Sequence, residues 1–537
     1  MMEKTFERYV SSGAMNAVEE LIGPALSKGL AQQTALIGDA KSLTYGELDL
    51  LVSQYSDALR KAGVVRENRV LFMLNDSPDF VAAYLGAMHM GAVSIAFNVR
   101  SAAKDLLFVI EDSNCSMLVI DAAYLPVYLQ IADRIKRPLK VVVDGDYEGD
   151  LPMLGSIVES GVTGSPALKV SPDDMAFWVY TSGTTGTPKA AVHLHHDVII
   201  ADLHMRENLG VEPGDRIFST SKLFFAYALG HSLLGGLRSC ATIILTKQWP
   251  DATAISEIIH RHQPDLVFSV PTLYRNLLRD GVAGTGPFKS VRVYVSAGEK
   301  LPVKLFEQWW LATGRPILEG IGTSETLFLY VANSIKQFRS GSCGKPVPWA
   351  EIKLMDESEQ AISTTDTPGQ LWVRMPSVAD RYWNRQDQSR KSFHGHWYKT
   401  GDMFRVDEAG WWYHLGRGDE MLKISGQWVS PAEIEACALT VPGVEAAAVI
   451  GYSNEDSLVR SALFVVPRQW GADDPTFTDK IRQTLVQTLS IYKCPRVIRL
   501  VDEIPCTASG KMQKYKLREL LREEAGGGEQ SACQAKA

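Results

Sequence analysis

Residues 180–189 have the sequence YTSGTTGTPK, and this stretch says most about the fold and the chemistry of the chain. Gly183 and Gly186 can adopt positive φ, which lets neighbouring backbone N–H groups point toward one centre. Lys189 adds a positive charge at the end of the stretch. Further hydrogen-bond donors are the hydroxyl groups of Thr181, Ser182, Thr184 and Thr185. This combination predicts a loop that binds phosphate groups.

The stretch differs from a Walker A loop and from a surface linker. In a Walker A loop a lysine directly follows the last glycine, whereas here Thr187 and Pro188 intervene after Gly186. A linker rich in Ser, Thr and Gly is the commoner source of such a composition. However, apolar runs at 175–180 and 190–194 flank the stretch directly. We therefore expect a loop embedded between two strands.

Composition describes an ordinary globular protein. The chain has 537 residues, 45% of them hydrophobic and 22% charged, which favours at least two domains. The net charge of -7 argues against nucleic acid or an anionic membrane as a partner. No apolar segment approaches the length of a membrane span. The cysteines form no CxxC pair, so we expect reduced thiols, a cytoplasmic location and no zinc site. They stand at positions 115, 240, 343, 437, 494, 506 and 533.

The pattern of apolar residues predicts an α/β fold with largely parallel sheets. Residues 44–62 begin with Thr44 and Glu47, the spacing of a capping box, and continue with apolar residues at helical spacing. Short apolar runs then alternate with helical stretches on both sides of the phosphate loop. Strands are expected at 69–74, 116–120, 140–143, 241–245, 266–270, 291–295 and 316–319, and further helices at 79–90 and 252–263.

We predict a large N-terminal body over residues 1–418, built from stacked, mostly parallel sheets with helices. Its last part, from about 345 to 418, has short alternating runs typical of a small antiparallel β lobe. A small, mobile α+β C-terminal domain is expected over 419–522, and a disordered tail over 523–537.

The C-terminal domain shows its own helix and strand signals. Ser430, Pro431 and Glu433 have the spacing of an N-cap, a first-turn proline and a capping-box acid. Pro442 and Gly443 are expected to end that helix. Strands are predicted at 446–450 and 461–466, and a helix at 478–489.

Four polar clusters carry a family resemblance. They are the phosphate loop, GIGTSE at 320–325, YKTGD at 398–402 with LGRGDE at 415–420, and PCTASGK at 505–511. With these motifs in this order, the chain resembles the acyl-adenylate-forming superfamily of acyl-CoA synthetases, peptide-synthetase adenylation domains and luciferases. The resemblance extends from about residue 40 to 520.

The resemblance implies a reaction in two steps. A carboxylate attacks the α-phosphate of ATP to give acyl-AMP and pyrophosphate, and a thiol then displaces AMP. The phosphate loop with Lys189 would bind the β- and γ-phosphates, and Glu325 would ligate Mg²⁺, since a carboxylate suits a hard cation. Ser324 would assist at the α-phosphate. The remaining nucleotide contacts would come from Gly322, Thr323, Asp402 at the ribose, and Arg417 beside it.

The resemblance also implies a catalytic lysine on a moving domain. Lys511 corresponds to the lysine that bridges the attacking carboxylate and the α-phosphate. In the family the C-terminal domain rotates about an aspartate, here Asp419, between the two steps. The segment KISGQW at 423–428 would then serve the thiol step, with Lys423 and Gly426 at the CoA tunnel.

Departures from the family pattern point to an aryl acid. Phe225 stands where many members carry a histidine, and Ile321 stands where an aromatic residue is common. With LFFAYALG and ETLFLYVAN, these departures look closest to the benzoate-CoA ligase branch. His231 is expected to pack in the core. The expected pocket residues are Phe225, Ala226, Tyr227, Gly298, Gly320, Ile321 and Phe328.

The histidines of the VHLHH segment, His193, His195 and His196, do not predict a metal site. We expect no metal there because no carboxylate or cysteine stands at ligand spacing, and such histidines often follow this loop in the family.

The function expected is an aryl-CoA ligase that uses MgATP and CoA, acting as a monomer or homodimer. An alternative is a stand-alone adenylation enzyme that loads an aryl acid onto a carrier-protein thiol. A non-catalytic nucleotide-binding paralogue is the third possibility, and the presence of both Glu325 and Lys511 argues against it.

Overall fold

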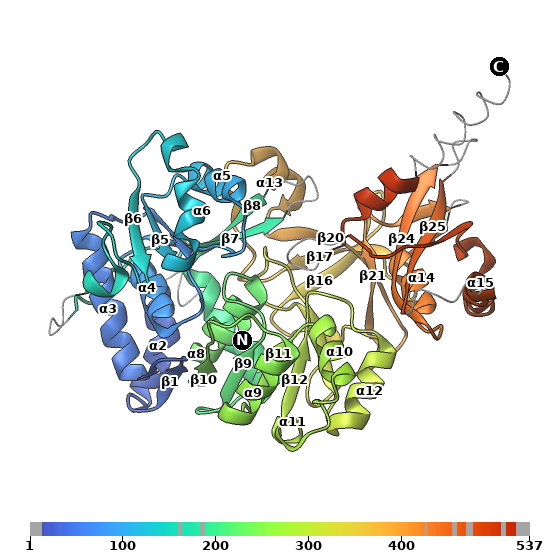
Figure 1. Cartoon of the computed structure of the whole chain (residues 1–537), viewed down its shortest axis with the longest axis horizontal. Helices are drawn as coiled ribbons and strands as arrows, with labels where there is room; N and C mark the ends of the chain where they lie inside the picture. Colours follow the sequence, from blue (N-terminus) through green and yellow to red (C-terminus); the bar gives the residue numbers. More distant parts are fainter. Residues whose placement is uncertain are drawn as a thin grey trace. The chain divides into compact units, whose positions relative to one another are not determined.

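The computed structural model describes residues 13–158, 164–182, 188–424, 427–453, 459–468, 476–505 and 512–521 (Figure 1). These residues fall into two compact units. The first comprises Met1–Lys353, Trp372–Thr400 and Gly410–Trp412, and the second Leu354–Leu371, Gly401–Ala409 and Tyr413–Ala537. The domain boundary expected at 418/419 lies within the second unit and stays a prediction.

A seven-stranded sheet forms one part of the first unit, with the order β18-β8-β7-β4-β3-β5-β6. The strands β7, β4, β3, β5 and β6 run parallel, as the apolar runs predicted, and β8 and β18 add antiparallel at one edge. Their bounds are β3 Arg69–Met73, β4 Val93–Ala96, β5 Met117–Asp121, β6 Lys140–Asp144, β7 Met175–Ser182, β8 Pro188–Leu194 and β18 Arg381–Tyr382.

Helices accompany this sheet in the alternation that the sequence predicted. They are α2 (Ala17–Ser27), α3 (Tyr45–Lys61), α4 (Pro78–His89) and α5 (Ala103–Ser113). The capping box is present at the start of α3: the Thr44 side chain accepts a hydrogen bond from the Glu47 N–H, and the Glu47 carboxylate accepts one from the Thr44 N–H. Both donors would otherwise lack a helical partner, which is why this pair marks the helix start.

A nine-stranded sheet forms the other part of the first unit, with the order β15-β14-β13-β12-β11-β9-β10-β1-β2. Its strands from β13 to β1 are parallel, and β2, β14 and β15 are antiparallel additions at the two edges. The bounds are β1 Thr34–Ile37, β2 Ser42–Thr44, β9 Arg216–Ser219, β10 Thr242–Ile244, β11 Leu266–Ser269, β12 Val293–Ser296, β13 Ile317–Ile321, β14 Val331–Ala332 and β15 Lys345–Pro346.

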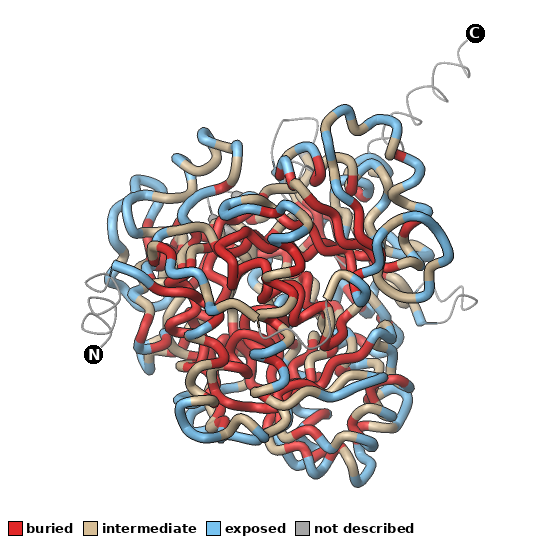
Figure 2. The backbone as a smooth tube through the Cα atoms, turned by 90° about the vertical axis from the view of Figure 1, so that its left-hand side faces the viewer, coloured by how far each residue is buried: buried red, intermediate tan, exposed pale blue. Residues whose placement is uncertain are grey.

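The residues of the parallel strands in the nine-stranded sheet are mostly buried, as expected for strands covered on both faces. Figure 2 shows buried backbone in the interior and exposed backbone mostly at the periphery. One face, with Tyr294 of β12, packs against Tyr274 and Trp309 from the helices α10 (Pro271–Arg279) and α12 (Val303–Thr313). The helix α9 (Ala252–His262) covers the same face. Alternate residues, such as Val295, turn to the opposite face. That opposite face carries the candidate substrate residues.

A five-stranded sheet contributes residues to both units. Its order is β16-β17-β20-β19, with β21 paired to β20. The bounds are β16 Glu351–Met355, β17 Gly369–Arg374, β19 Phe393–His394, β20 Trp397–Val406 and β21 Trp412–Arg417, and the helix α13 is Gln386–Ser392. The short alternating runs that the sequence shows from about residue 345 therefore correspond to β-strands.

The rest of the second unit is a small α+β fold. A hairpin of β22 (Leu422–Ile424) and β23 (Gln427–Val429) precedes a three-stranded sheet with the order β24-β25-β26. The sheet is formed by β24 Val444–Ser453, β25 Val459–Pro467 and β26 Val497–Leu500, with the helices α14 Pro431–Ala438 and α15 Thr476–Thr488.

The start of α14 agrees with the sequence, but its end does not. The Ser430 hydroxyl accepts a hydrogen bond from the Glu433 N–H at 3.3 Å, and Pro431 is the first helical residue. The helix ends at Ala438, ahead of the predicted stop at Pro442 and Gly443. The reason is local: the N–H and the hydroxyl of Thr440 both donate to the carbonyl of Cys437, which would otherwise bond to the next helical turn.

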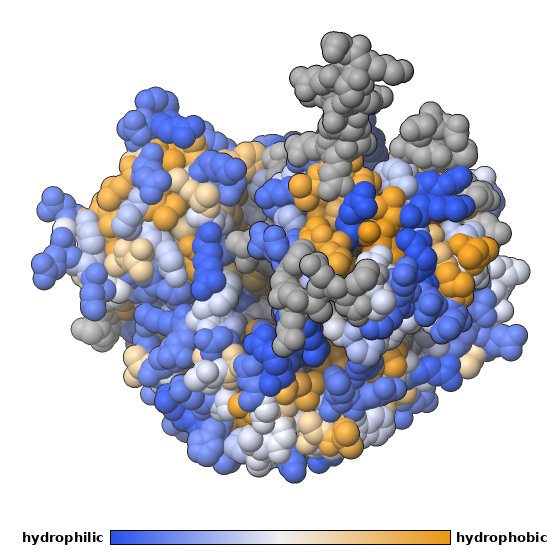
Figure 3. Space-filling model, turned by 45° about the vertical axis from the view of Figure 1, so that its right-hand side comes forward, coloured by the Kyte–Doolittle hydropathy of each residue, from blue (hydrophilic) through white to orange (hydrophobic). Residues whose placement is uncertain are grey.

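Surface and cysteine positions agree with the composition. Figure 3 shows a mainly hydrophilic face on which apolar residues form small separate groups. Among the described residues, no helix is long and apolar enough to cross a membrane. Cys115, Cys240, Cys343 and Cys437 are buried, and Cys494 is partly exposed.

Candidate active site

The phosphate-loop stretch connects two paired strands. Strands β7 and β8 pair antiparallel, with Thr181 opposite Lys189 and Ser182 opposite Pro188. This confirms that the stretch lies between ordered strands. The side chain of Ser182 and the whole of Gly183, Thr184, Thr185 and Gly186 lie outside the described residues. The Lys189 ammonium lies 4.2 Å from the ring centroid of Tyr382 on β18, so a cation–π contact fixes its direction.

Glu325 is a buried carboxylate in the turn that follows strand β13. Only 7% of this residue is exposed, and its Oε1 accepts a hydrogen bond of 2.6 Å from the Tyr382 hydroxyl. Burial raises the pKa of Tyr382, and the nearby negative charge of Glu325 raises it further, so the phenol stays protonated and can donate. Tyr382 therefore connects the phosphate-loop lysine to the turn that carries Glu325, residues 322–327, which we call the acid turn.

The turn itself is held by Thr326. Its hydroxyl accepts from the Thr323 N–H at 3.1 Å and is 3.0 Å from the carbonyl oxygen of Phe328. Leu327 has a φ of 59°, an unusual conformation for a branched residue, which indicates local strain. Gly322 is required by space, since a Cβ there would lie 2.8 Å from the Phe328 carbonyl oxygen.

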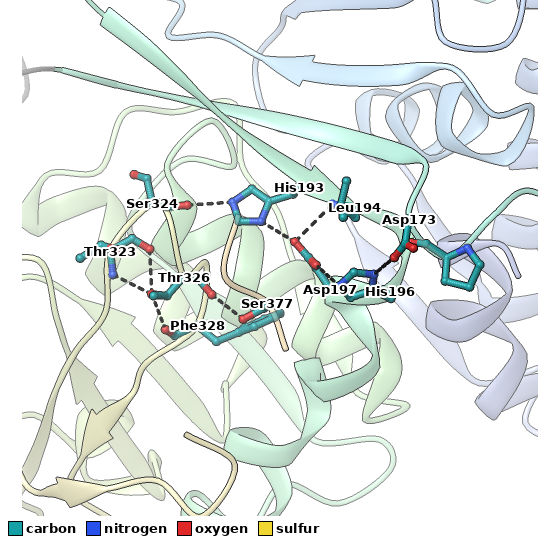
Figure 4. A network of polar contacts seen from close by, with 11 residues as sticks. Asp173, His193, Leu194, His196, Asp197, Thr323, Ser324, Thr326, Phe328 and Ser377 are labelled. Atoms are coloured by element: carbon teal, nitrogen blue, oxygen red, sulfur yellow. Dashed lines mark hydrogen bonds and ion pairs between the residues drawn. The ribbon is translucent and has the colours of Figure 1, made fainter. Parts of the chain in front are cut away.

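Two other segments, strand β8 and the stretch after β17, hold the turn from outside, and Figure 4 shows the contacts of His193 and Ser377. The Ser324 carbonyl accepts from Nε2 of His193 at 2.8 Å, the Glu325 carbonyl from the Ala379 N–H at 2.7 Å, and the Thr326 carbonyl from the Ser377 hydroxyl at 2.6 Å. Consecutive carbonyl groups are thus all satisfied. Such pre-organisation is what a site needs to hold a charged group in one position.

The expectation that no carboxylate stands at ligand spacing from the VHLHH histidines is wrong. Asp197 is a carboxylate at ligand spacing: its Oδ2 lies 2.7 Å from Nδ1 of His193, and its Oδ1 lies 3.2 Å from Nε2 of His196. Both ring nitrogens of His193 already have protein partners, because Nε2 contacts Ser324. His195 is separate, and its Nδ1 accepts from the Ala17 N–H.

The expected aryl-pocket residues gather at the carboxyl ends of parallel strands, where α/β folds bind ligands. Gly320 and Ile321 are the last residues of β13, and Gly298 follows the neighbouring strand β12. Gly298 has a φ of 85°, which favours glycine. At Gly320 a Cβ would lie 2.5 Å from a methyl carbon of Leu329, so a side chain is excluded there.

Aromatic rings cover this end of the sheet. The ring of Tyr227 packs on Phe268 of β11 at 5.9 Å and on His231 at 5.7 Å, and His231 meets the edge of Phe328 at 5.7 Å. Tyr227 and Phe328 are therefore brought together through His231. Phe225 is half-buried, and its ring packs at a tilt against that of Phe224, with centroids 4.5 Å apart. Ala226, which lies between Phe225 and Tyr227 in the sequence, is also half-buried.

His231 is a core residue, as expected, with a defined tautomer. Its Nδ1 faces the carbonyl oxygen of Tyr227 at 3.3 Å, and its Nε2 accepts from the Leu329 N–H at 3.3 Å. A carbonyl can only accept, so the hydrogen is on Nδ1. Burial lowers the pKa of His231 to about 4, against the opposing effect of the Tyr227 carbonyl, so the ring is neutral at pH 7.

The second unit contains the candidate ribose site. Asp402 on β20 is 5% exposed, and its Oδ1 lies 3.3 Å from Nε2 of His414 and 3.3 Å from Nη1 of Arg417, both on β21. Burial raises the pKa of Asp402, but the hydrogen bonds and charges of His414 and Arg417 outweigh it and hold the pKa below its ordinary value. The group is therefore a stable carboxylate acceptor.

The backbone conformation and the close approach of Arg417 require a glycine, Gly401, directly before Asp402. Its φ is 79°, and a Cβ there would lie 2.7 Å from Nη2 of Arg417. The missing side chain lets the guanidinium approach. Asp419, the predicted hinge residue, is exposed, and its Oδ1 lies 3.9 Å from Nε of Arg417.

Some predicted site residues cannot be placed. Lys511 and Gly426 lie outside the described residues, and Lys423 is described only as part of strand β22, with no account of its side chain. Their predicted roles therefore stay predictions.

Tyr382 and His414 are site residues that sequence reasoning missed. Tyr382 is 57 positions from Glu325 and lies outside every quoted motif, so only the folded chain joins them. His414 lies on β21, which pairs directly with the strand that carries Asp402, and its place directly before LGRGDE was the available signal in the sequence.

The acid turn fits a magnesium ion better than a metal held by protein alone. Tyr382 occupies Oε1 of Glu325, and no described residue contacts the other oxygen. Within the described ranges there is also no group of three or more His, Cys, Asp or Glu side chains arranged to hold a metal. Mg²⁺ is often bound by one or two carboxylates together with substrate phosphates. A single available carboxylate oxygen is consistent with that mode.

Two family models match the chain: the AMP-binding enzyme model over residues 27–383 and the AMP-binding enzyme C-terminal domain over 433–511. The chain belongs to the AMP-binding enzyme family, on its aryl-CoA ligase branch. It is an AMP-forming acid–thiol ligase with ATP and CoA as substrates. The predicted family, fold class and enzyme class are confirmed.

Particular relatives cover nearly the whole chain. A 3-hydroxybenzoate–CoA ligase of Aromatoleum sp. (strain CIB) is 50% identical over 522 residues, which are 96% of this chain and 99% of the relative. A 3-hydroxybenzoate–CoA/4-hydroxybenzoate–CoA ligase of Thauera aromatica is 48% identical, covering 95% and 98%. The solved structure of a benzoate CoA ligase from Burkholderia xenovorans LB400 has a TM-score of 0.84 and 32% identity, covering 94% and 100%.

We predict that Tyr382→Phe lowers the ATP-dependent activity about 10- to 100-fold, because a hydrogen bond to a buried charged group is worth roughly 1.5–3 kcal/mol. Steady-state kinetics with varied MgATP measures the effect. Tyr55→Phe is the matched control, since the Tyr55 phenol donates to Asp79 at 3.0 Å on other helices. Equal kinetic effects of the two changes would contradict the assignment.

His231 predicts a loss of stability in acid. Its folded pKa of about 4 lies below that of an unfolded histidine, about 6.5, so the unfolded chain binds the proton first as the pH falls. The contribution is fully present above pH ~6.5 and is lost between there and pH ~4, on the order of 3 kcal/mol.

Urea unfolding of the wild type and of His231→Gln at pH 7 and pH 4.5 measures this contribution. The difference in free energy of unfolding between the two proteins should shrink at the lower pH. The exposed residue His396 supplies the control, because His396→Gln should keep the pH dependence of the wild type. A difference that is independent of pH would contradict the prediction.

Proposed function

We propose that the chain activates benzoate or a hydroxylated benzoate with ATP and CoA, giving aryl-CoA, AMP and pyrophosphate. The observation that carries the proposal is the arrangement at the end of strand β13. Gly320 and Ile321 end the strand, a Cβ at Gly322 would meet the Phe328 backbone, and the turn with Glu325 follows at once. The Phe328 ring packs on His231, which in turn packs on Tyr227. Phe328, a candidate aryl contact, and Glu325, the candidate magnesium ligand, thus lie three residues apart on the segment that follows β13. The near full-length similarity to 3-hydroxybenzoate–CoA ligases supports the choice of substrate.

In the first step an oxygen of the aryl carboxylate attacks the α-phosphorus, an O–P bond forms, and pyrophosphate leaves. Lys189 and the phosphate loop bind the β- and γ-phosphates, and Ser324 assists at the α-phosphate. Glu325 would hold Mg²⁺, which neutralises phosphate charge. Asp402 accepts hydrogen bonds from the ribose hydroxyls, with Arg417 beside it. The carboxylate of Asp402 suits this role because its pKa is low.

In the second step the CoA thiol loses its proton to solvent as its sulfur attacks the acyl carbon, a C–S bond forms, and AMP leaves with the electron pair of the broken C–O bond. Rotation about Asp419 and a tunnel beside Lys423 and Gly426 are the proposed devices for this step. A carrier protein as acceptor, a monomer or homodimer, and a cytoplasmic location stay predictions.

Pyrophosphate exchange tests the substrate assignment. The wild type is assayed with 3-hydroxybenzoate, 4-hydroxybenzoate, benzoate and a medium-chain fatty acid, with free CoA or a carrier protein as acceptor in the second step. We expect exchange with the aryl acids, strongest for a hydroxylated one, little with the fatty acid, and aryl transfer to CoA. Exchange driven best by the fatty acid, or by no acid, would refute the proposal.

Lys511→Ala is expected to lower aryl-AMP formation by about 10²–10³-fold, because a charge that stabilises the transition state is lost. Thioester formation from supplied aryl-AMP and CoA should stay within a few-fold of the wild type. Separate assays of the two half-reactions measure this. An equal loss in both would argue against a lysine that serves one step only.

A further inference from the structure

We propose that His193, held by Asp197, is a positioning residue that sets the direction of Glu325 through the backbone of the acid turn. The inference rests on the proposed function for what Glu325 binds. The contacts that carry it are independent of the substrate. They form a continuous chain from Asp197 to His193 to the Ser324 carbonyl (Figure 4).

The hydrogen-bond partners determine what the His193 ring does. Its Nε2 faces the Ser324 carbonyl at 2.8 Å, and a carbonyl oxygen only accepts, so Nε2 donates. Its Nδ1 lies 2.7 Å from Oδ2 of Asp197, within hydrogen-bonding distance. The same Oδ2 accepts from the Leu194 N–H at 3.2 Å, which anchors the carboxylate to strand β8. Each ring nitrogen of His193 therefore has one specific partner, Asp197 for Nδ1 and the Ser324 carbonyl for Nε2.

Burial makes this arrangement rigid. The side chains of His193 and Asp197 are both 0% exposed, so water cannot replace either partner. The ring is stacked on Phe177 of strand β7, with centroids 5.0 Å apart and planes 11° apart. Rotation of the ring would break both hydrogen bonds and the stacking together.

The bond to Ser324 acts directly on Glu325. The Ser324 carbonyl and the Glu325 N–H belong to the same planar peptide group. Holding that oxygen therefore fixes the plane from which Glu325 starts. The Ala379 N–H holds the next carbonyl, and Tyr382 holds the carboxylate, so Glu325 is fixed at both peptide groups and at its side-chain end.

Strand β8 also carries the phosphate-loop lysine. Lys189 and His193 are four residues apart on this strand, and alternation places them on the same side. One strand therefore presents a phosphate ligand and supports the acid turn. A shift of the turn would change the position of Glu325 relative to Lys189, and displacements of about 1 Å can cost on the order of 10²-fold in rate.

His196 supplies a matched comparison. It also lies beside Asp197, with its Nε2 3.2 Å from Oδ1, but its Nδ1 contacts the Pro172 carbonyl at 3.1 Å. It shares the carboxylate with His193, but its other ring nitrogen is directed to Pro172 ahead of strand β7, where that of His193 is directed to the turn. A residue that only stabilises the fold should behave like His196.

Two isosteric substitutions separate the two bonds of His193. In His193→Asn the amide nitrogen takes the place of Nδ1, which keeps the contact with Asp197 but cannot reach Ser324. In His193→Gln the amide nitrogen takes the place of Nε2 and can still donate to Ser324. Both substitutions remove the imidazole ring and its stacking, so they differ mainly in which hydrogen bond survives.

We expect His193→Asn to lower kcat for aryl-AMP formation by about 10- to 100-fold, with the KM for the aryl acid changed less than about threefold. His193→Gln should recover most of this loss, and His196→Asn should stay within about twofold of the wild type. Thioester formation from supplied aryl-AMP should be unchanged in all three. Equal losses in the Asn and Gln variants, or no loss in His193→Asn, would overturn the proposal.

Hydrogen exchange of peptides that cover residues 322–327 gives a readout without catalysis. Exchange should accelerate in His193→Asn and in Asp197→Asn, and stay near the wild type in His193→Gln and His196→Asn. If His193→Asn does not fold, the result for Asp197→Asn decides by the same criterion. A wild type without aryl-dependent exchange of pyrophosphate would refute the proposed function alone, because the hydrogen-exchange comparison would still test the positioning.

Discussion

A carboxylate that is almost completely buried must have its charge balanced by fixed partners, and Glu325 imposes this requirement on everything around it. Tyr382 donates to one oxygen, and burial keeps that phenol protonated so that it can do so. The other oxygen has no partner among the described residues and is the one available for a cation. The same phenol ring lies under the ammonium of Lys189. Tyr382 thus contacts both Glu325 and Lys189, the two charged groups that serve the phosphates in the proposed reaction.

The fold supplies the supports for this carboxylate from segments that are distant in sequence. Strand β8 brings His193, the segment after β17 brings Ser377 and Ala379, and strand β18 brings Tyr382. Strand β18 pairs with β8, so these supports share one sheet edge. The turn is therefore a junction at which the two sheets of the first unit are joined by hydrogen bonds. Its one strained residue, Leu327, is tolerated because the surrounding bonds determine the backbone so fully.

Sequence reasoning performed well where the physics is local. The capping box at Thr44 and Glu47, the N-cap at Ser430 and the parallel strands follow from nearest-neighbour spacing and from hydrophobic periodicity. Predictions were wrong or missing where the outcome depends on side-chain hydrogen bonds that hydrophobic periodicity does not reveal. Helix α14 stops early because Thr440 bonds to its own turn, a side-chain effect that the Pro442 signal hid. The contact of Asp197 with His193 was not predicted, although Asp197 directly follows the VHLHH segment.

By itself, the sequence determined the family and the order of the motifs, because hydroxyl groups, glycines, Glu325 and Asp402 occur at spacings that few other functions require. It could not determine which groups hold those residues in place. The partnerships of Glu325 with Tyr382, of Asp402 with His414 and of His193 with Ser324 depend on strand pairing across tens of residues. Only the tertiary structure decides such contacts, because the free energy of burying a charge is set by the atoms that surround it in space.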